Sequence, residues 1–145
     1  MNLIIGCDHG GFLLKQELIR RLEKEGHKVE DAGCYSEDMV DYPDIAVNVC
    51  NRLLEEEYDR GILICGTGIG VSIAANKVKG IRAALCSDCF SARMSMEHNN
   101  ANVITLGART LGIELAWEIL KTYLSSEFIF GIHEKRVEKI NMILK

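Results

Sequence analysis

Two segments of this 145-residue chain combine polar side chains with glycines at positions where an apolar run gives way to a helical pattern. The first is Gly6 to Gly11, which contains Asp8 and His9. Backbone N–H groups at such a junction favour an anionic or hydroxyl-rich ligand. Asp8 could therefore accept hydrogen bonds from sugar hydroxyls, and His9 could contact a phosphate. Taken singly, Asp8 could equally be a helix cap and His9 a solvated loop residue.

The second segment is a glycine-rich loop that begins at Cys65 and contains Thr67. Its glycines, Gly66, Gly68 and Gly70, let the chain turn tightly and present N–H groups that could hold an oxyanion. A cysteine beside a helix N-terminus favours the thiolate, so Cys65 could act as a base or nucleophile. Cys65 could instead be a small buried hydrophobe, and Thr67 could be a helix cap or a proton relay.

A third polar segment, Glu97 to Asn102, contains one histidine and three asparagines before an apolar strand pattern. A helix cap would use one asparagine, so His98 beside Asn99 fits a general acid or base next to a hydroxyl-binding amide. Arg109 and Arg136 could each pair with a phosphate in a bidentate manner, although Arg136 alone could be an exposed helix residue.

Strand and helix patterns alternate along the whole chain. This alternation, with strands that are apolar on both faces, predicts a mostly parallel sheet of about five strands with helices on each side. Ligands of such sheets bind beyond the carboxyl ends of the strands. Tyr42, at the helix start marked by Pro43, is either a packing residue or a lid over the site. The predicted strands are 3–5, 28–30, 62–64, 81–86 and 103–106, and the predicted helices are 12–25, 45–57, 71–78, 90–97, 111–124 and 133–144.

Composition narrows the class of protein. A hydrophobic content of 48% over 145 residues suits one domain, 1–145, with a real core. The net charge of −4 is spread along the chain, which disfavours nucleic-acid binding, and we expect no leader and no membrane span. Six scattered cysteines predict reduced thiols and a cytoplasmic location. Cys86 and Cys89 have the spacing of half a zinc site, but without a second pair we expect no metal.

Five motifs in order along nearly the whole chain resemble the type B ribose-5-phosphate isomerases. They are Gly6 to Phe12, Asp41 to Pro43, Ile64 to Gly70, Ala74 to Lys77 and His98 to Val103. The resemblance implies a Rossmann-like three-layer α/β/α sandwich, with no cofactor, nucleotide or metal. It also implies a homodimer or a dimer of dimers with active sites shared between subunits, and a C-terminal helix, about 133–144, that packs at or reaches the subunit interface.

The same resemblance implies a role for each candidate residue. His98 assists opening of the furanose ring, the Cys65 thiolate moves a proton between C2 and C1, and Thr67 handles the hydroxyl protons. The loop amides of Gly66, Gly68 and Gly70 stabilise the enediolate. Asp8 and Asn99 bind the sugar hydroxyls, and Tyr42 lines the site. The phosphate is bound by His9, Arg109 and Arg136. We expect the base, the ring-opening histidine and the anion loop on one rim, with some residues supplied by the partner subunit.

Two positions refine this expectation. A subgroup of the family carries a glutamate as base where this chain has Val71, so Cys65 marks the cysteine subtype. The family's usual arginine before the last helix is here Ile132, which removes a charged phosphate contact unless Lys135 or His133 compensates. The alternatives are therefore an isomerase of allose 6-phosphate, galactose 6-phosphate or an unphosphorylated aldose. From other classes come a nucleotide-binding or redox module and a structural protein.

Overall fold

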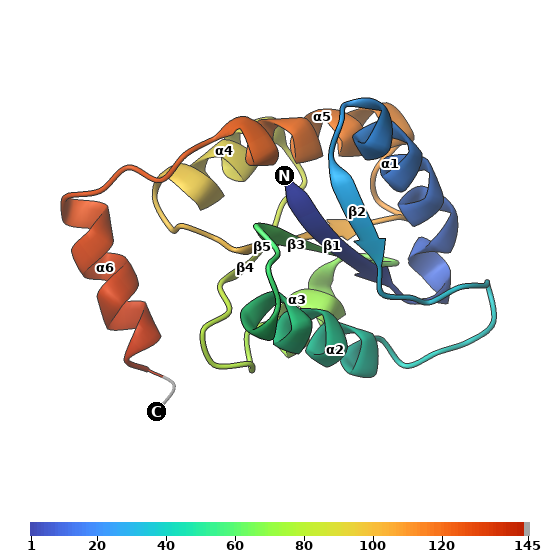
Figure 1. Cartoon of the computed structure of the whole chain (residues 1–145), viewed down its shortest axis with the longest axis horizontal. Helices are drawn as coiled ribbons and strands as arrows, with labels where there is room; N and C mark the ends of the chain where they lie inside the picture. Colours follow the sequence, from blue (N-terminus) through green and yellow to red (C-terminus); the bar gives the residue numbers. More distant parts are fainter. Residues whose placement is uncertain (144–145) are drawn as a thin grey trace.

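The strands form one sheet in which every neighbouring pair is parallel. A computed structural model describes residues 1–143 of the chain. The sheet has five strands, the number predicted, and their order is β2-β1-β3-β5-β4 (Figure 1). The strands are β1 (Asn2–Cys7), β2 (Lys28–Asp31), β3 (Arg60–Cys65), β4 (Ala83–Leu85) and β5 (Val103–Gly107).

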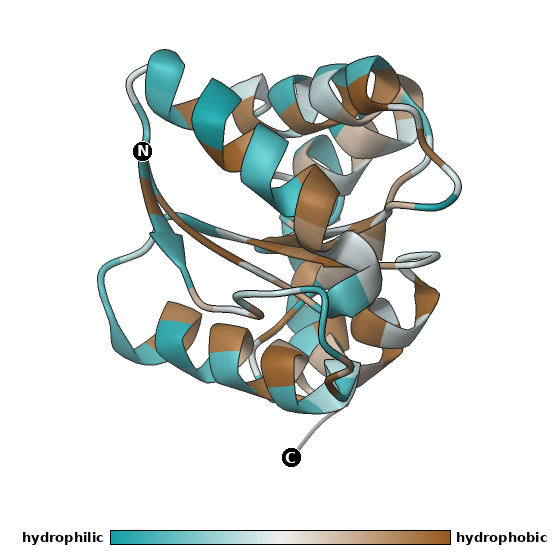
Figure 2. Cartoon of the chain, turned by 90° about the vertical axis from the view of Figure 1, so that its right-hand side faces the viewer, coloured by the Kyte–Doolittle hydropathy of each residue, from teal (hydrophilic) through white to brown (hydrophobic). Residues whose placement is uncertain are grey.

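Helices cover both faces of the sheet, which makes three layers. The buried faces of α1, α4 and α5 pack with Leu3, Ile5 and the other strand residues of the same orientation. The alternate strand residues, such as Ile4 and Leu63, pack against α2 and α3. Figure 2 shows hydrophobic strands in the middle between the two layers. The helices are α1 (Phe12–Lys24), α2 (Tyr42–Glu55), α3 (Ile69–Ala75), α4 (Cys89–Glu97), α5 (Ile113–Ser125) and α6 (Ile132–Asn141), with a short 3₁₀ turn, η1 (His9–Gly11).

Several boundaries differ from the prediction for identifiable reasons. Helix α3 ends at Ala75, three residues early, because the Asn76 side chain accepts a hydrogen bond from Ala83 N and donates to Ala83 O, at 2.9 Å each. Asn76 thereby joins the end of α3 to the start of β4. Helix α2 begins at Tyr42 with Pro43 in its first turn, where proline costs no hydrogen bond. The last residue of the predicted helix 133–144 lies outside the described residues.

The final helix stands apart from the three layers, at the left of Figure 1. Only Val137 of α6 is buried, whereas α5 buries six residues. No helix within residues 1–143 combines the length and the apolar composition that crossing a bilayer requires.

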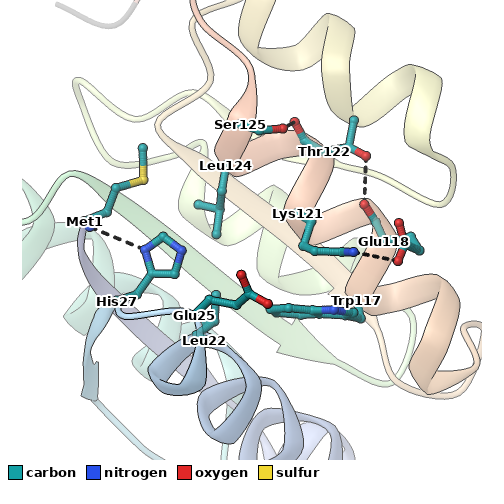
Figure 3. A pocket seen from close by; sticks show the side chains of 10 residues that line it. All are labelled: Met1, Leu22, Glu25, His27, Trp117, Glu118, Lys121, Thr122, Leu124 and Ser125. Carbon is teal, nitrogen blue, oxygen red and sulfur yellow. Dashed lines mark hydrogen bonds and ion pairs between the residues drawn. The ribbon is translucent and has the colours of Figure 1, made fainter.

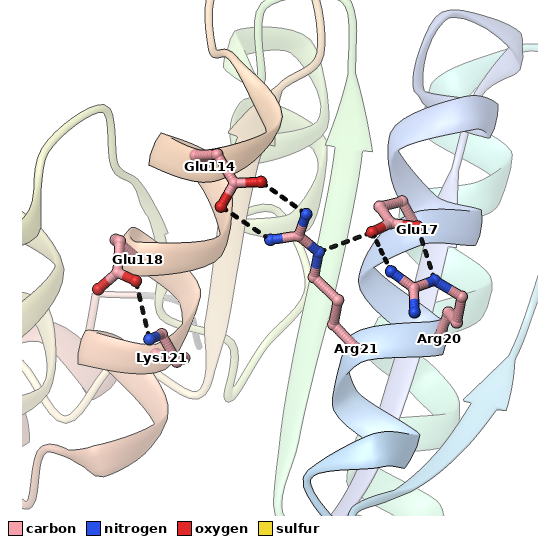
Figure 4. A network of polar contacts seen from close by, with 6 residues as sticks. All are labelled: Glu17, Arg20, Arg21, Glu114, Glu118 and Lys121. Carbon is pink, nitrogen blue, oxygen red and sulfur yellow. Dashed lines mark hydrogen bonds and ion pairs between the residues drawn. The ribbon is translucent and has the colours of Figure 1, made fainter.

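Polar contacts join α1 and α5 on the outer face of one helix layer (Figure 4). Arg21 bridges the two helices, with its Nη2 2.7 Å from Glu114 Oε1 and its Nε 2.7 Å from Glu17 Oε1. Lys121 pairs with Glu118 at 2.8 Å within α5. Such exposed pairs contribute about 0–1 kcal/mol each, so this network orients the helices more than it stabilises the fold.

Candidate active site

The carboxyl end of β3 presents the sulfur of Cys65 to a backbone donor. The Gly68 N–H donates to Cys65 Sγ at 3.1 Å, and only 5% of Cys65 is exposed. Gly68 has φ +77°, a left-handed conformation that side chains other than glycine rarely adopt, and this turn aims the amide back at the sulfur. The turn thus places a backbone donor on the sulfur that the sequence indicates as a candidate base or nucleophile.

The hydroxyl of Thr67 lies in the same loop and is exposed. Its Oγ1 accepts a hydrogen bond from Ile69 N at 3.3 Å, so Thr67 does help to start α3. The hydroxyl hydrogen remains available to a ligand, because accepting this bond uses only an oxygen lone pair. The capping and proton-relay interpretations of Thr67 are therefore compatible.

The loop after β1 places Asp8 and His9 beside this turn. Asp8 N donates to Ile64 O at 3.1 Å, which joins the ends of β1 and β3. Asp8 Oδ1 caps η1 by accepting from Gly11 N at 3.2 Å. His9 Nδ1 accepts from Val40 N at 3.4 Å, which places the ring proton on Nε2 in the neutral form and makes Nε2 a donor. Asp8 is thus both a cap and a candidate ligand.

Arg109 links the loops that follow β1, β3 and β5. Its backbone N donates to Gly66 O at 2.9 Å. Its side chain lies against both glycine loops, because a Cβ built on Gly66 would be 3.4 Å from Arg109 Nη1, and one on Gly10 would be 3.6 Å from Nη2. The guanidinium is exposed and lies next to backbone N–H groups of both loops. This corner is suited to a phosphate.

Tyr42 covers the far side of the glycine loop. A Cβ at Gly70 would come within 2.6 Å of Tyr42 Cζ, so only glycine lets this ring pack on the loop. Tyr42 is still 39% exposed. Its position fits a residue that both packs against the loop and lines the site.

The loops that follow β1, β3 and β5 at the carboxyl end of the sheet form what we call the Cys65 rim. A buried lysine packs beneath this rim. Lys15 is fully buried, forms an ion pair with Asp31 and donates to the Cys34 carbonyl. Cys34 N in turn donates to Cys7 O at 2.7 Å, next to Asp8. Sequence analysis missed Lys15, although a signal was present: a lysine stands on the apolar face of the helix beside Leu14 and Leu18.

His98 does not lie at this rim within one chain, so the expectation of a single rim is wrong for the monomer. Helix α4 starts after the carboxyl end of β4 and returns to the amino end of β5, and His98 caps its C-terminus. Asn99 and Asn100 follow it, and Arg82 Nε, just before β4, donates to both of their carbonyls. The sulfur of Cys65 therefore lies at the carboxyl end of the strands and the imidazole of His98 at their amino end. We call this amino end of the sheet the His98 edge.

Arg136 belongs to the His98 edge. The His98 and His133 rings are stacked, with centroids 4.1 Å apart, and Arg136 follows His133 by one turn of α6. Asn102 is structural, since its amide donates to Gly80 O and its Oδ1 accepts from Arg82 N. Of the predicted residues, the rim thus brings together Asp8, His9, Tyr42, Cys65, Gly66, Thr67, Gly68, Gly70 and Arg109, and the opposite edge holds His98, Asn99 and Arg136.

Neither cysteine spacing nor any other feature forms a metal centre in the described chain. Within residues 1–143, no three His, Cys, Asp or Glu side chains are grouped as metal ligands would be. Cys86 is buried at the end of β4, and burial raises the pKa of its thiol to about 11. Cys86 is thus a neutral core residue.

A pocket of about 490 Å³ lies between α1 and α5, away from the Cys65 rim (Figure 3). Several of its polar side chains are paired with one another or with the backbone: Lys121 with Glu118, Thr122 with the Glu118 carbonyl, and His27 with the Met1 amine. The exposed Arg109 guanidinium, in contrast, lies beside Gly10 and Gly66 with its donors open to solvent. The chemistry of the rim marks it as the candidate site.

The chain is similar to known sugar-phosphate isomerases over nearly its whole length. Residues 3–140 match the family model described as Ribose/Galactose Isomerase. The chain is 46% identical to ribose-5-phosphate isomerase B of Escherichia coli, over 98% of this chain and 95% of that protein. It is 44% identical to D-erythrulose-4-phosphate isomerase of Pectobacterium atrosepticum, over 97% and 93%. The solved ribose-5-phosphate isomerase B of Clostridium thermocellum superposes with a TM-score of 0.97 at 51% identity, covering 99% and 97% of the two chains.

Proposed function

Because this chain belongs to the ribose/galactose isomerase family, we propose that it interconverts D-ribose 5-phosphate and D-ribulose 5-phosphate without a cofactor. The observation that carries the proposal is the Cys65 sulfur held under the Gly68 amide, on a rim that also bears Asp8 and Arg109. Base, anion donors and hydroxyl acceptor are the groups that aldose–ketose isomerisation needs.

The reaction begins with opening of the furanose. The anomeric hydroxyl gives its proton to solvent water as the C1 carbonyl forms, and the bond between C1 and the ring oxygen breaks as His98 protonates that oxygen. His98 regains a proton from solvent before the next turnover. The Cys65 thiolate then takes the C2 proton, and the Gly66 to Gly70 amides stabilise the enediolate. Cys65 returns the proton to C1, while Thr67 helps to move a proton from O2 to O1. No electrons are exchanged with any other molecule.

The remaining predicted residues bind the substrate. Asp8 accepts hydrogen bonds from the sugar hydroxyls, and the Asn99 amide can both accept from them and donate to them. Tyr42 lines the part of the site that holds the sugar. His9, with its Nε2 donor, joins Arg109 and Arg136 at the phosphate. Bidentate guanidinium contacts give the phosphate end both affinity and orientation.

We propose that each active site is shared between two copies of the chain. The Cys65 rim and the His98 edge lie at opposite ends of the sheet, so one chain cannot place both groups on one substrate. A twofold dimer that sets the His98 edge of one copy against the Cys65 rim of the other completes two sites at once. Ile132, the first residue of α6, and Phe130 just before it are 60% and 65% exposed. These apolar side chains support a place for α6 at that interface.

The proposed reaction is tested by the turnover of D-ribose 5-phosphate in metal-stripped protein. Cys65→Ala should lower kcat by about 10²–10⁴-fold with the fold intact, because it removes the base. Cys50→Ala, which removes a buried thiol from α2, serves as the matched control and should keep wild-type kcat. Equal activity of Cys65→Ala and wild type would show that the base is another group.

Sharing of the site is tested by complementation. Cys65→Ala and His98→Asn are each inactive alone, but a mixed dimer keeps one intact site, built from Cys65 of one copy and His98 of the other. Coexpression should therefore recover up to about a quarter of wild-type activity at random assortment. No recovery in purified mixed dimers would contradict a shared site.

A tetrose phosphate is the second candidate substrate. The relative named D-erythrulose-4-phosphate isomerase is 44% identical to this chain, and Ile132 places an apolar side chain where the family resemblance predicts an arginine. An aldotetrose 4-phosphate cannot close to a furanose, because its O4 carries the phosphate. Turnover of D-erythrulose 4-phosphate that survives His98→Asn would favour this substrate, and allose 6-phosphate and galactose 6-phosphate complete the panel.

We further propose that residues 1–145 act as one domain in the cytoplasm. The six cysteines Cys7, Cys34, Cys50, Cys65, Cys86 and Cys89 are free thiols, which supports a reducing compartment. One continuous sheet with helices on both faces supports the single domain.

A further inference from the structure

Two histidines far apart in the chain form a parallel stack at the amino edge of the sheet. The rings of His98 and His133 have centroids 4.1 Å apart and an interplanar angle of 7°. His98 ends α4, and His133 is the second residue of α6. The segment between the helices approaches α4 again where Ile129 N donates to Glu97 O at 2.9 Å. The backbone therefore holds the two rings near each other.

A second contact fixes the far end of α6. Arg82 Nη1 donates to Asn141 Oδ1 at 3.1 Å, while its Nε donates to the carbonyls of Asn99 and Asn100. One guanidinium thus joins the residues after His98 to the last residue of α6. The position of the helix, and with it the place of the His133 side chain beside His98, is therefore fixed at both ends.

The charge state of His133 suits it to face another imidazole. Burial lowers the pKa of His133, and the charges of His98 and Arg136 lower it further. A neutral His133 ring offers its π face to His98 without repelling a proton that His98 carries. His133 is therefore suited to contact His98 while His98 acts as the acid.

We infer that His133 is a positioning residue that fixes the ring plane of His98 for proton delivery to the furanose oxygen. The inference rests on the proposed function. The terminal torsion of histidine is broad, so an imidazole that is only partly buried at a helix end would otherwise rotate. Proton transfer requires an aimed donor, and the stack restricts the ring to one plane. His133 thereby acts on kcat through His98, and it does not bind the phosphate.

The test compares His133→Ala with His133→Phe, which keeps an aromatic face but cannot bind a phosphate or titrate. We expect His133→Ala to lower kcat on D-ribose 5-phosphate roughly 10- to 100-fold with KM within about twofold of wild type. His133→Phe should recover most of the lost kcat. Lys139→Ala, an exposed position on the same helix, is the control and should match wild type.

A second readout separates ring opening from the later proton transfer. D-ribulose 5-phosphate is acyclic because its O5 carries the phosphate, so exchange of its C1 hydrogen with solvent deuterium needs Cys65 and no ring opening. His133→Ala should keep the wild-type exchange rate, followed by NMR. Equal loss of exchange and turnover, failure of His133→Phe to recover kcat, or a rise in KM as the main effect would each overturn the inference. If wild type turns over no ribose 5-phosphate, the proposed function fails instead.

Discussion

The Cys65 rim and the pocket between α1 and α5 differ in how their polar groups are used. In the pocket, Lys121 pairs with Glu118 and His27 accepts a hydrogen bond from the Met1 amine, so these side chains are already engaged within the protein. At the rim, the hydrogen bonds among residues 1–143 leave the Arg109 guanidinium and one Asp8 oxygen for a ligand. Cavity volume alone would favour the pocket, whereas the free donors and acceptors favour the rim. Four changes test this contrast.

Removal of the buried charge beneath the rim should have the largest effect. Lys15→Met should lower the free energy of unfolding by about 3 kcal/mol, because Asp31 loses its buried ammonium partner. Chemical denaturation measures the loss. The double variant Lys15→Met with Asp31→Asn should recover part of it, since no uncompensated carboxylate remains. A change below about 0.5 kcal/mol in the single variant, the size of an ordinary surface substitution, would show that the pair does not stabilise the rim.

Loss of the rim guanidinium should come next. Arg109→Met should raise KM for D-ribose 5-phosphate about 10- to 100-fold, because a charge-assisted hydrogen bond contributes about 1.5–3 kcal/mol. Steady-state kinetics measures this change, with Arg20→Met on the exposed face of α1 as the control. An unchanged KM in Arg109→Met would move the phosphate away from the corner formed by the two glycine loops.

The ion pair beside the pocket should contribute less. Glu114→Gln removes one partner of Arg21 but leaves Glu17 in place, so the free energy of unfolding should fall by under about 1 kcal/mol. Turnover should be unchanged, because the pair lies on the outer face of the helices. An activity loss comparable to that of Arg109→Met would contradict the assignment of the site to the rim.

The smallest effect should be a pH dependence of stability at the pocket. Burial, and next the N-terminal charge, lower the pKa of His27 below its ordinary value of 6.5. The unfolded chain therefore binds a proton first as the pH falls, so this histidine's contribution is present above pH 6.5 and is lost below it. His27→Gln should flatten the decline in melting temperature between pH 7 and pH 5, without altering turnover at pH 7.5. An equally steep decline in the variant would assign the effect to other groups.

The sequence predicted the strands and the rim better than it predicted helix ends and the second half of the site. Apolar runs located the inner strands, the short pattern at residues 28–30 located β2, and the rule for carboxyl ends located Cys65, Asp8 and Arg109 at one end of the sheet. The end of α3 could not be predicted, because the Asn76 contacts with Ala83 join residues that have no local pattern.

Two features show what kind of information a sequence pattern lacks. The resemblance assigned His98 to ring opening, but residue type says nothing about which edge of the sheet it occupies; the direction of α4 decides that. The stack with His133 joins residues 35 positions apart in different helices, so no spacing rule could reveal it.

The separation of Cys65 and His98 has a consequence for how activity depends on protein concentration. A single chain carries both halves of the proposed site, but its own His98 and its own Cys65 cannot act on the same substrate molecule. Under the proposed sharing of the site, catalysis starts only when a second copy docks, and the loss of specific activity on dilution would then report the dissociation constant of the dimer.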